Sequence, residues 1–565
     1  MVKSDSDGDQ AVQRSEAQYD ALTDLASPLL VPPASRRYNL QYSALYDYRL
    51  RRLKHPKGRL LAAATKRWTD GVYEEEENTV INEESQTSTA STSSNSKSRK
   101  RGRREEPLPT ANYVKRILDV KQGKICFVIG TIYCSMHLKP DVLEELTREQ
   151  WLPPQTPNER YADPEKDEFF VEDESGRVRL VGDGLAPDGY LRNALVTGVV
   201  VAILGTETRS GDFEVADAIF AGVPAPDETN SNGSHKVKKE NSKSDAMDLD
   251  ENADEGEWVA LVSGLNIEPA KTDFTVKAEG QNATKDKQNG LTNLENESMM
   301  GFAEAELRSM LLTDWLLGAV ENDDNITEKV VGLVIAGNSI APAPRNNDEK
   351  SLGPRNNHSG PPASKDAYPT STFDDFLADL VSSMHVHLLP GSNDPTSIAL
   401  PQQPLHFALL PKSSPFSGLH RETNPAWFGL AGKKFLGTSG QNIDDIFKYM
   451  LETDPESRLD AACNTLDWGH VAPTAPDTLA CYPLNDRDPF LIESAPDVYF
   501  VGNQDKLSTR LYHGTNGHKI RVILLPKFST TGSVVLVNTK TLAIKHVNVG
   551  WPAIPHHVHE EELEG

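Results

Sequence analysis

Residues 385–394 read HVHLLPGSND, and this stretch decides the fold class of the C-terminal half of the chain. A short apolar run stops at a Pro-Gly turn, which is typical of a buried strand that ends in a loop. Two earlier runs have the same design, and amphipathic segments separate the runs. The sequence therefore predicts a sheet covered by helices, with polar loops at the strand ends. The predicted strands span residues 258–263, 330–336, 385–389, 498–501, 520–525 and 533–537. The predicted helices span residues 302–320 and 373–384, with Ser371 or Thr372 as the N-cap of the second.

The region before residue 227 has a different rhythm. It begins with a helical pattern over residues 38–68 and a shorter one over residues 111–120. Short strands follow at residues 124–137, at 168–181 as a hairpin, and at 194–206 and 213–220. This pattern predicts a small Greek-key barrel such as an OB-fold, and a plain β-sandwich would give the same pattern.

The composition limits where the chain can fold and what it can bind. The 565 residues carry 58 Lys and Arg against 83 Asp and Glu, a formal net charge of −25, and 37% are apolar. We do not expect such a chain to bind DNA over its whole surface, because that requires clustered cations. Four scattered cysteines predict neither a disulfide scaffold nor a zinc motif, and we expect no signal peptide and no membrane span. Polar composition predicts disorder at residues 1–36, 71–109, 227–257, 271–297, 341–367 and 551–565.

The residues at the predicted strand ends can be compared with the ligands of a metal site. The order of the predicted strands resembles the calcineurin-type phosphoesterases, whose active members hold two divalent ions with D-x-H, G-D, G-N-H-D/E and G-H-x-H motifs. The corresponding positions here are Ser263 and Leu265, Asn338, Ser392 and Asn393, and Asn503 and Asp505. His470 is a candidate for the further histidine of that family. Two amides and one carboxylate cannot offset the dehydration of two divalent ions, so we expect no catalytic residue, no metal and no cofactor.

Longer motifs give a narrower resemblance. They are PGSNDPT at residues 390–396, LPQQPLH at 400–406, FLGTSGQN at 435–442, PTAPDTLACYP at 473–483, DPF at 488–490 and YFVGN at 499–503. Together they resemble the signature of the B-subunits of replicative DNA polymerases. With the predicted helix that contains Tyr42 and Tyr46, they are most similar to the small, or second, subunits of polymerase delta. The resemblance covers residues 37–68 and 110–549 apart from the polar insertions.

The resemblance implies an α+β regulatory scaffold without chemistry of its own. An OB-fold barrel at residues 110–226 would join an inactive, calcineurin-like β-sandwich flanked by helices at residues 258–550, and residues 37–70 would pack on the OB domain. The implied partners are the C-terminal metal-binding domain of the catalytic subunit of polymerase delta and a third, elongated subunit that reaches the sliding clamp. The catalytic subunit of polymerase zeta is a further partner, the clamp is contacted only indirectly, and DNA is bound at most weakly. The implied setting is nuclear DNA replication, repair and translesion synthesis.

A basic run inside a predicted linker indicates nuclear localisation. It contains Lys97, Arg99, Lys100, Arg101, Arg103 and Arg104. A solvated charge run is the alternative.

Two rival functions stay open. The first is a surviving metal-dependent phosphodiesterase or exonuclease. The second is a barrel that binds single-stranded nucleic acid by stacking bases on its aromatic side chains. Those side chains alternate with Val and Ile, which favours a core role; they are Phe127, Tyr133, Phe169, Phe170, Phe213 and Phe220.

Two other patterns favour structural roles. His385 and His387 can point to one face of their strand but lack a third metal ligand. Residues 441–449 resemble a sliding-clamp box, but Asp444 and Lys448 occupy the aliphatic and second aromatic positions, which favours a core helix.

Overall fold

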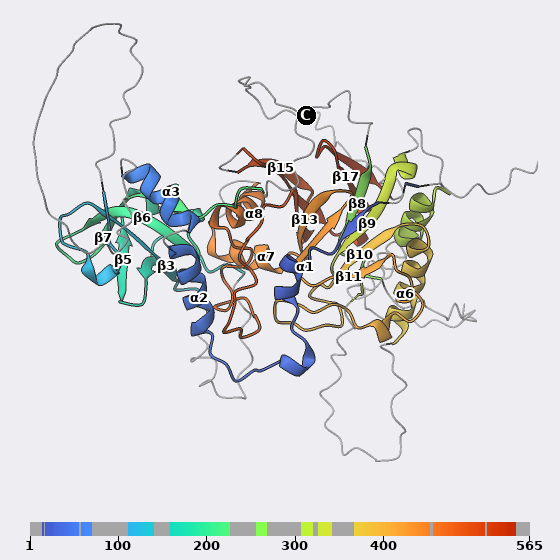
Figure 1. The fold of residues 1–565 in the computed structure, drawn as a ribbon, viewed down its shortest axis with the longest axis horizontal. Helices are drawn as coiled ribbons and strands as arrows, with labels where there is room; N and C mark the ends of the chain where they lie inside the picture. The colour runs from blue at the N-terminus through green and yellow to red at the C-terminus, as the bar shows by residue number, and fades with distance from the viewer. Residues whose placement is uncertain are drawn as a thin grey trace, which may run out of the picture.

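A barrel and a two-sheet sandwich contain all the named strands of the described chain (Figure 1). The structure is a computed structural model that describes residues 14–15, 17–55, 58–69, 111–140, 159–226, 256–267, 307–319, 326–341, 367–451, 456–514 and 517–549. The predicted linkers at 71–109 (which contains the basic run) and 271–297, nearly all of 227–257 and 341–367, and the tail at 551–565 lie outside these residues.

Five strands close the barrel. β3 (Cys126–Ser135), β4 (Glu168–Glu172) and β5 (Arg177–Val181) pair in succession, β7 (Phe213–Phe220) lies parallel to β5, and β6 (Val200–Glu207) pairs with both β7 and β3. The predicted hairpin over residues 168–181 is confirmed by β4 and β5. Because β6 pairs with β3, the strands form a closed barrel rather than a plain sandwich.

Two helices that precede the barrel in the chain pack against it. α2 (Ser43–Lys54) contacts β3 and β6, and α3 (Arg59–Trp68) contacts β6 and β7. The helix predicted over residues 111–120 is wrong. β2 (Asn112–Tyr113) pairs with β3, and only a 3-10 turn at Ile117–Asp119 follows. A short isolated helix is only marginally stable in water, whereas pairing with β3 gives this segment stable backbone hydrogen bonds.

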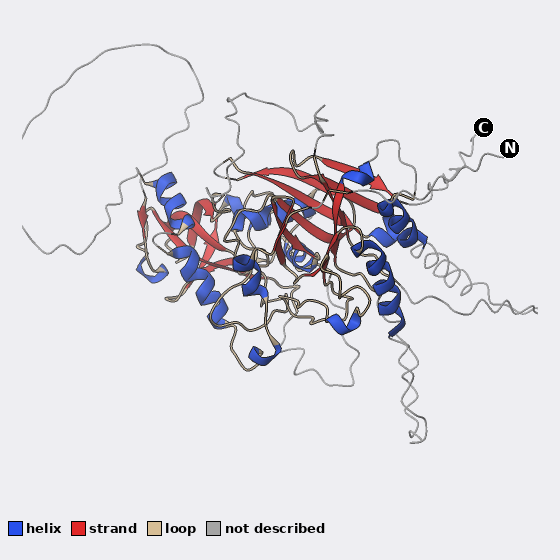
Figure 2. Ribbon diagram, turned by 45° about the vertical axis from the view of Figure 1, so that its right-hand side comes forward, coloured by secondary structure: helices blue, strands red, loops and turns tan. Residues whose placement is uncertain are grey.

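The sandwich consists of two six-stranded sheets stacked face to face (Figure 2). The first sheet has the order β11 (Leu419–Arg421), β10 (His385–Leu389), β9 (Val330–Ala336), β8 (Trp258–Val262), β17 (Ser533–Asn538) and β18 (Ile544–Asn548). The second has the order β1 (Tyr19–Asp20), β12 (Ala426–Leu430), β13 (Lys433–Thr438), β14 (Val498–Gln504), β16 (Lys519–Pro526) and β15 (Ser508–His513). Side chains such as Leu261, Val334, Phe428 and Phe500 fill the space between the sheets.

Helices cover the outer faces of both sheets. α6 (Ala367–Val381) and helical residues 307–317 pack on the first sheet, and α7 (Gln441–Tyr449) and α8 (Ser457–Trp468) pack on the second. Because α6 begins at Ala367, the predicted N-cap at Ser371 or Thr372 is wrong. The short helices are α1 (Thr23–Ala26), α9 (Phe528–Thr531), and 3-10 turns at Ser27–Leu29, Pro33–Ser35, Asp183–Leu185, Arg192–Ala194, Ile326–Lys329 and Phe407–Leu409.

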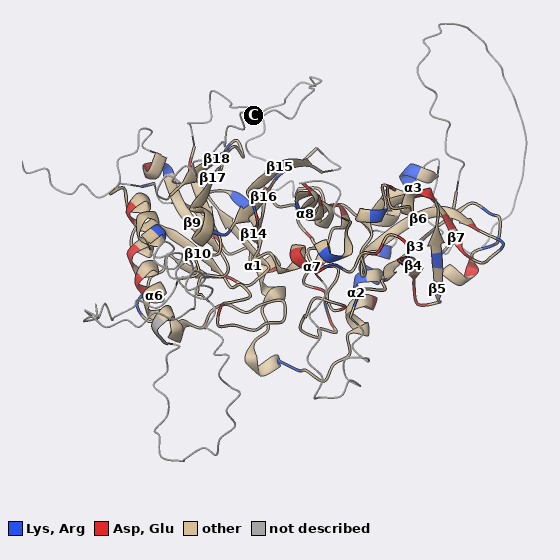
Figure 3. Cartoon of the chain, turned by 180° about the vertical axis from the view of Figure 1, so that it is seen from behind, with Lys and Arg blue, Asp and Glu red and all other residues tan. Residues whose placement is uncertain are grey.

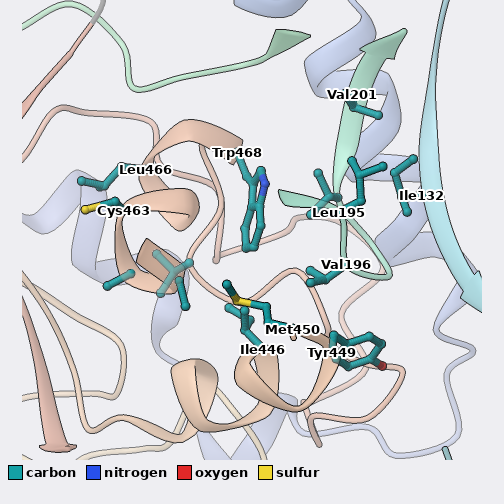
Figure 4. Close-up of a cluster of buried hydrophobic side chains, with 14 of the residues drawn as sticks. Ile132, Leu195, Val196, Val201, Ile446, Tyr449, Met450, Cys463, Leu466 and Trp468 are labelled. Atoms are coloured by element: carbon teal, nitrogen blue, oxygen red, sulfur yellow. The ribbon is translucent and has the colours of Figure 1, made fainter. Parts of the chain in front are cut away.

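A shared apolar core joins the barrel to the sandwich. Figure 4 shows Trp468 and Ile446 facing Leu195 and Val196, and all four side chains are buried. The indole N–H of Trp468 donates to the carbonyl of Ala194 at 2.9 Å. The barrel and the second sheet therefore pack through α7 and α8 as one continuous core.

An N-terminal strap, residues 17–36, crosses the sandwich. Its β1 pairs with β12, while Leu29 packs in the core shared with the barrel and Val31 is buried beside Leu45 of α2. The prediction of disorder over residues 1–36 is wrong for this part, and residues 1–13 lie outside the described chain. The strap is rich in apolar side chains but has no long periodic pattern, and its order depends on the core surfaces that bury Leu29 and Val31.

Candidate functional site at the strand ends

Five strand ends converge where the two sheets meet. Ser263 follows β8, Asn338 stands two residues after β9, and Gly391 stands two residues after β10. Ser439 follows β13, and Asn503 lies near the end of β14. The structure therefore brings together most of the residues that the sequence aligned with a phosphoesterase site.

Asn503 connects these ends through its amide. The side-chain Nδ2 donates to the carbonyl oxygens of Ala336 at 3.1 Å and Ser439 at 2.9 Å. The backbone N–H of Asn503 donates to Oγ of Ser263 at 2.9 Å, and that hydroxyl contacts the carbonyl of Pro526 at 3.0 Å. One asparagine thus links strands of both sheets.

Asn338 holds the loop that follows β10. Its Oδ1 accepts from the Ser392 hydroxyl at 3.2 Å and from the backbone N–H of Asn393 at 3.0 Å. The backbone φ is 52° at Asn338 and 58° at Asn503. Asparagine is among the non-glycine residues that best tolerate this left-handed region, so both positions have a conformational reason to be asparagine.

Asp394 supplies the buried carboxylate next to this network. Oδ2 accepts from the backbone N–H of Gly391 at 2.8 Å, and Oδ1 accepts from that of Ile340 at 3.0 Å. Burial raises the pKa of Asp394 to about 6, although these N–H groups act in the opposite direction. The carboxylate already holds the backbone of two loops and is not oriented as a free metal ligand.

The strand ends also approach each other closely. A Cβ at Gly391 would lie 2.3 Å from the backbone nitrogen of Asn338, and a Cβ at Gly337 would lie 2.4 Å from Oγ of Ser439. Gly337 also has a φ of 77°. Only glycine permits this packing.

The donor set does not fit a pair of divalent ions. Among the described residues, no three His, Cys, Asp or Glu side chains form a group able to hold a metal ion. Asn503 Oδ1 is buried without a hydrogen-bond partner, but it is one neutral oxygen. Divalent ions such as Mg²⁺ and Ca²⁺ require several oxygen ligands, usually with carboxylates among them.

Two of the predicted positions, Leu265 and Asp505, lie outside the network. Leu265 is fully buried in the core beneath the first sheet. Asp505 is largely exposed and pairs with Arg458 at 3.4 Å.

The network also contains three residues that were not predicted as site residues: Ser439, Asp394 and Gln402. The side chain of Gln402 donates to the Gly391 carbonyl at 3.1 Å. All three occur in the quoted motifs, which was the available signal.

His470, the candidate for a further histidine, belongs to a separate buried cluster. Its Nε2 lies 2.9 Å from Asp488 Oδ2, and its Nδ1 accepts from the backbone N–H of Ala472 at 3.2 Å. Burial, with the charge of Arg49, lowers the pKa of His470 to about 4. A neutral imidazole that donates through Nε2 satisfies both contacts.

Arg49 of α2 completes this cluster and ties three parts of the chain together. Its guanidinium binds Asp488 at 2.7 Å and donates to the carbonyl oxygens of Gly198 of the barrel at 3.0 Å, Pro473 at 2.8 Å and Ala475 at 3.0 Å. Both charged side chains are fully buried. Burial would raise the pKa of Asp488, but Arg49 and His470 hold it well below its usual range.

Half of the six barrel aromatics are buried in the core. Phe127, Phe169 and Phe213 are buried, whereas Tyr133, Phe170 and Phe220 are half-buried. Cations and anions intermingle over the barrel in Figure 3, and Arg177 near Tyr133 pairs with Glu172 at 2.6 Å. This surface has no uniform positive field to attract phosphates.

The other candidate residues have structural partners. His385 and His387 both contact His420, and Tyr19 of the strap stacks on His420 with ring centroids 3.8 Å apart. In α7, Ile443 and Ile446 are buried, which confirms the core helix at the residues that resemble a clamp box.

Two family models match the chain. Residues 298–509 match the model of the B-subunits of DNA polymerase alpha/epsilon, and residues 41–218 match that of the DNA polymerase delta subunit OB-fold domain. The matches place the closed barrel and the strand-end site in the class of polymerase B-subunits with an OB-fold domain.

Curated relatives narrow the class. The DNA polymerase delta small subunit of Arabidopsis thaliana is 38% identical over 76% of this chain and 83% of its own length. That of Saccharomyces cerevisiae is 30% identical over 94% of this chain and 93% of its own. DNA polymerase delta subunit 2 of Drosophila melanogaster is 31% identical over 77% of this chain and 86% of its own. This chain belongs to the family of DNA polymerase delta small subunits. Within the described residues, the longest helices are too short and too polar to cross a bilayer.

Proposed function

We propose that this chain is a scaffold subunit of DNA polymerase delta and performs no reaction at its strand-end site. The asparagine network carries the proposal. Asn338 and Asn503 use their amides to fasten strand ends, and the neighbouring carboxylate of Asp394 is bound by backbone N–H groups. A site built this way keeps the shape of a phosphoesterase and lacks its charge.

The layer arrangement supports a calcineurin-like origin for the sandwich. β8, β9 and β10 run parallel in one sheet, and β13, β14 and β16 run parallel in the other, with helices outside both. The site lies at the carboxyl ends of parallel strands, where α/β folds commonly place ligands.

The proposed partners are the C-terminal metal-binding domain of the catalytic subunit of polymerase delta and a third, elongated subunit. The catalytic subunit of polymerase zeta is a further partner, and the sliding clamp is reached only through the third subunit. The relatives named as delta small subunits support this assignment. The rigid joint at Arg49 supports it as well, because a scaffold must hold two domains in fixed positions. We place the chain in the nucleus, with residues 97–104 as the import signal.

Affinity purification of the full chain from nuclear extract, followed by mass identification of partners, tests the scaffold. We expect the catalytic and third subunits of polymerase delta in near-equal amounts. Recovery of the chain without a polymerase catalytic subunit would refute the proposal.

Metal analysis and a nuclease assay test the inactive site. The purified chain should hold less than about 0.1 equivalent of manganese or zinc, as an order-of-magnitude threshold, and should not degrade single-stranded DNA in manganese. Stoichiometric metal with turnover that Asn338→Ala abolishes would support the phosphodiesterase instead. Salt-dependent binding of the full chain to an oligonucleotide, lost in Tyr133→Ala but retained in Leu118→Ala, would support the nucleic-acid rival.

A further inference from the structure

Four large apolar side chains are exposed where the strap meets α2. Leu30, Tyr38, Tyr42 and Ile398 are 43%, 72%, 41% and 86% exposed. In Figure 1 the blue chain between α1 and α2 passes below the lower end of α2. We call these four residues the strap patch.

Hydrogen bonds to Gln403 place Leu30 and Ile398 on adjoining segments of the chain. The side chain of Gln403 donates to the Leu29 carbonyl at 3.0 Å and accepts from the Val31 N–H at 2.8 Å. The backbone N–H of Gln403 donates to Oγ of Ser397 at 3.3 Å. Leu30 and Ile398 are each sequence neighbours of residues that bind Gln403.

Tyr38 and Tyr42 meet the same surface at the next loop. The ring of Tyr38 lies edge-on to that of Tyr482, with centroids 5.4 Å apart, and the Tyr42 hydroxyl donates to the Cys481 carbonyl at 2.9 Å. Tyr482 donates through its backbone N–H to the carbonyl of Leu400 at 2.7 Å, two residues from Ile398. The loops that carry the four exposed side chains are therefore joined to one another through Gln403 and Tyr482.

Fixed apolar groups on a solvent-exposed surface indicate an interaction site. Each Å² that a partner covers contributes about 25 cal/mol, and a rigid backbone loses little entropy on binding. Clustered, ordered apolar side chains are more informative than scattered ones.

Two cations beside the patch indicate the charge of the partner. Arg37 is exposed and Arg36 is partly exposed. Among the described residues, neither guanidinium has a carboxylate within ion-pair distance, although the chain has a net charge of −25. A second copy of the chain in a two-fold dimer would bring the same basic edge against itself, which disfavours self-association.

We propose that the strap patch binds an apolar segment flanked by carboxylates on another subunit of the polymerase. This inference rests on the proposed scaffold function and adds the surface and the chemistry of its partner. The apolar side chains cover the patch, and Asp or Glu residues beside them pair with Arg36 and Arg37.

Binding of the full chain to the purified catalytic subunit and to the third subunit, each measured at about 50 and 300 mM salt, tests the proposal. The variants are Tyr38→Ser/Ile398→Ser, Arg36→Glu/Arg37→Glu, and the control Leu118→Ser on the barrel, where Leu118 is 65% exposed. We expect the first variant to weaken one partner by at least about tenfold. The second variant should reverse the salt dependence, so that binding is weaker at about 50 mM than at about 300 mM salt, because two glutamates would repel the carboxylates of the partner. The control should stay within about twofold.

The outcomes separate the two proposals. If wild type binds a partner and both patch variants bind it as tightly, the strap patch is refuted and the scaffold remains. If wild type binds neither subunit, the scaffold proposal fails and the patch fails with it. A wild-type dimer that Tyr38→Ser/Ile398→Ser makes monomeric would overturn the proposal in favour of self-association.

Discussion

Replacing Arg49 by methionine should uncouple the barrel from the sandwich. The substitution keeps an apolar stem of similar length and removes the ion pair with Asp488 and the donors to three carbonyl oxygens. Removing one member of a buried ion pair costs about 3–5 kcal/mol, because the other charge stays buried without compensation. We expect Arg49→Met to lower the free energy of unfolding by that amount.

Urea unfolding of the full chain, followed by tryptophan fluorescence, measures the effect. Trp468 lies in the core between the two parts, so its emission reports on their contact. Arg51→Met on the same helix is the matched control; Arg51 is exposed, and within the described part of the chain its ion pair is with Asp47. Loss of an exposed pair of this kind should change stability by less than about 0.5 kcal/mol.

The pH dependence of the stability loss tests whether the unpaired charge of Asp488 causes it. In wild type Asp488 is ionised in both the folded and unfolded chain above about pH 5, so its contribution is constant there. In Arg49→Met, Asp488 or its partner His470 should take up a proton in the folded state. The folded variant then binds more protons than the unfolded chain, so its stability falls as pH rises from about 5 to 8, by up to about 1.4 kcal/mol per pH unit. The loss relative to wild type should therefore widen with pH.

A second substitution completes the test. Asp488→Asn in the Arg49→Met background removes the orphaned charge and should recover at least about 1 kcal/mol. If Arg49→Met unfolds at the midpoint of Arg51→Met, or if the double variant recovers nothing at about pH 8, the buried pair does not hold the joint and the reasoning is wrong.

Three other outcomes follow from the structure. Asn503→Ala should lose about 2–4 kcal/mol in urea unfolding, and Asn503→Gly about 1 kcal/mol less, because glycine tolerates the positive φ; equal losses would contradict the strain argument. Burial raises the pKa of Glu422 to about 7 and lowers those of His387 and His420 to about 3 and 4. As the pH falls from 7 to 4.5, Glu422 takes up a proton in the folded chain first, which stabilises the fold. Below pH 6.5 the two histidines are protonated mainly in the unfolded chain, which destabilises the fold. Glu422→Gln should make the loss of stability between about pH 6.5 and 5 steeper by about 1.4 kcal/mol per pH unit, and an unchanged slope in thermal or urea unfolding would refute it. Gly437→Ala should cost about 3 kcal/mol, because its Cβ would lie 1.9 Å from an aromatic ring of β14; a melting temperature within about 2 °C of wild type would contradict that packing.

Several continuous apolar strands could be predicted from sequence, whereas the buried β12, its neighbour β13 and most edge strands could not. β9 and β10 match the predicted residues, because strands buried on both faces read as unbroken apolar runs. β15 and β18 were missed; they lie at sheet edges, and none of their residues is fully buried. β1 has two residues and depends on pairing with β12, which no local pattern reports.

The sequence predicts which residues lie at the strand-end site but not which groups they contact. The motifs located Asn338 and Asn503 and showed that the expected ligands are absent. They gave no indication that Asn503 reaches the main chain at Ala336 and Ser439. The Arg49–Asp488 joint was missed because its partners are 439 positions apart in the chain, and periodicity carries no information over that separation.

The hydrogen bonds of its amide give Asn503 a structural reason to be asparagine. Its Nδ2 faces two carbonyl oxygens, so a carboxylate there would place negative charge against two acceptors with no proton to share. A histidine would have to hold a φ of 58° in a space already occupied by a five-strand junction. Restoring metal ligands one at a time would therefore break the junction before it created a metal site. The asparagine junction and a two-metal site would make competing demands on the same strand ends, and the hydrogen bonds of Asn503 serve the junction.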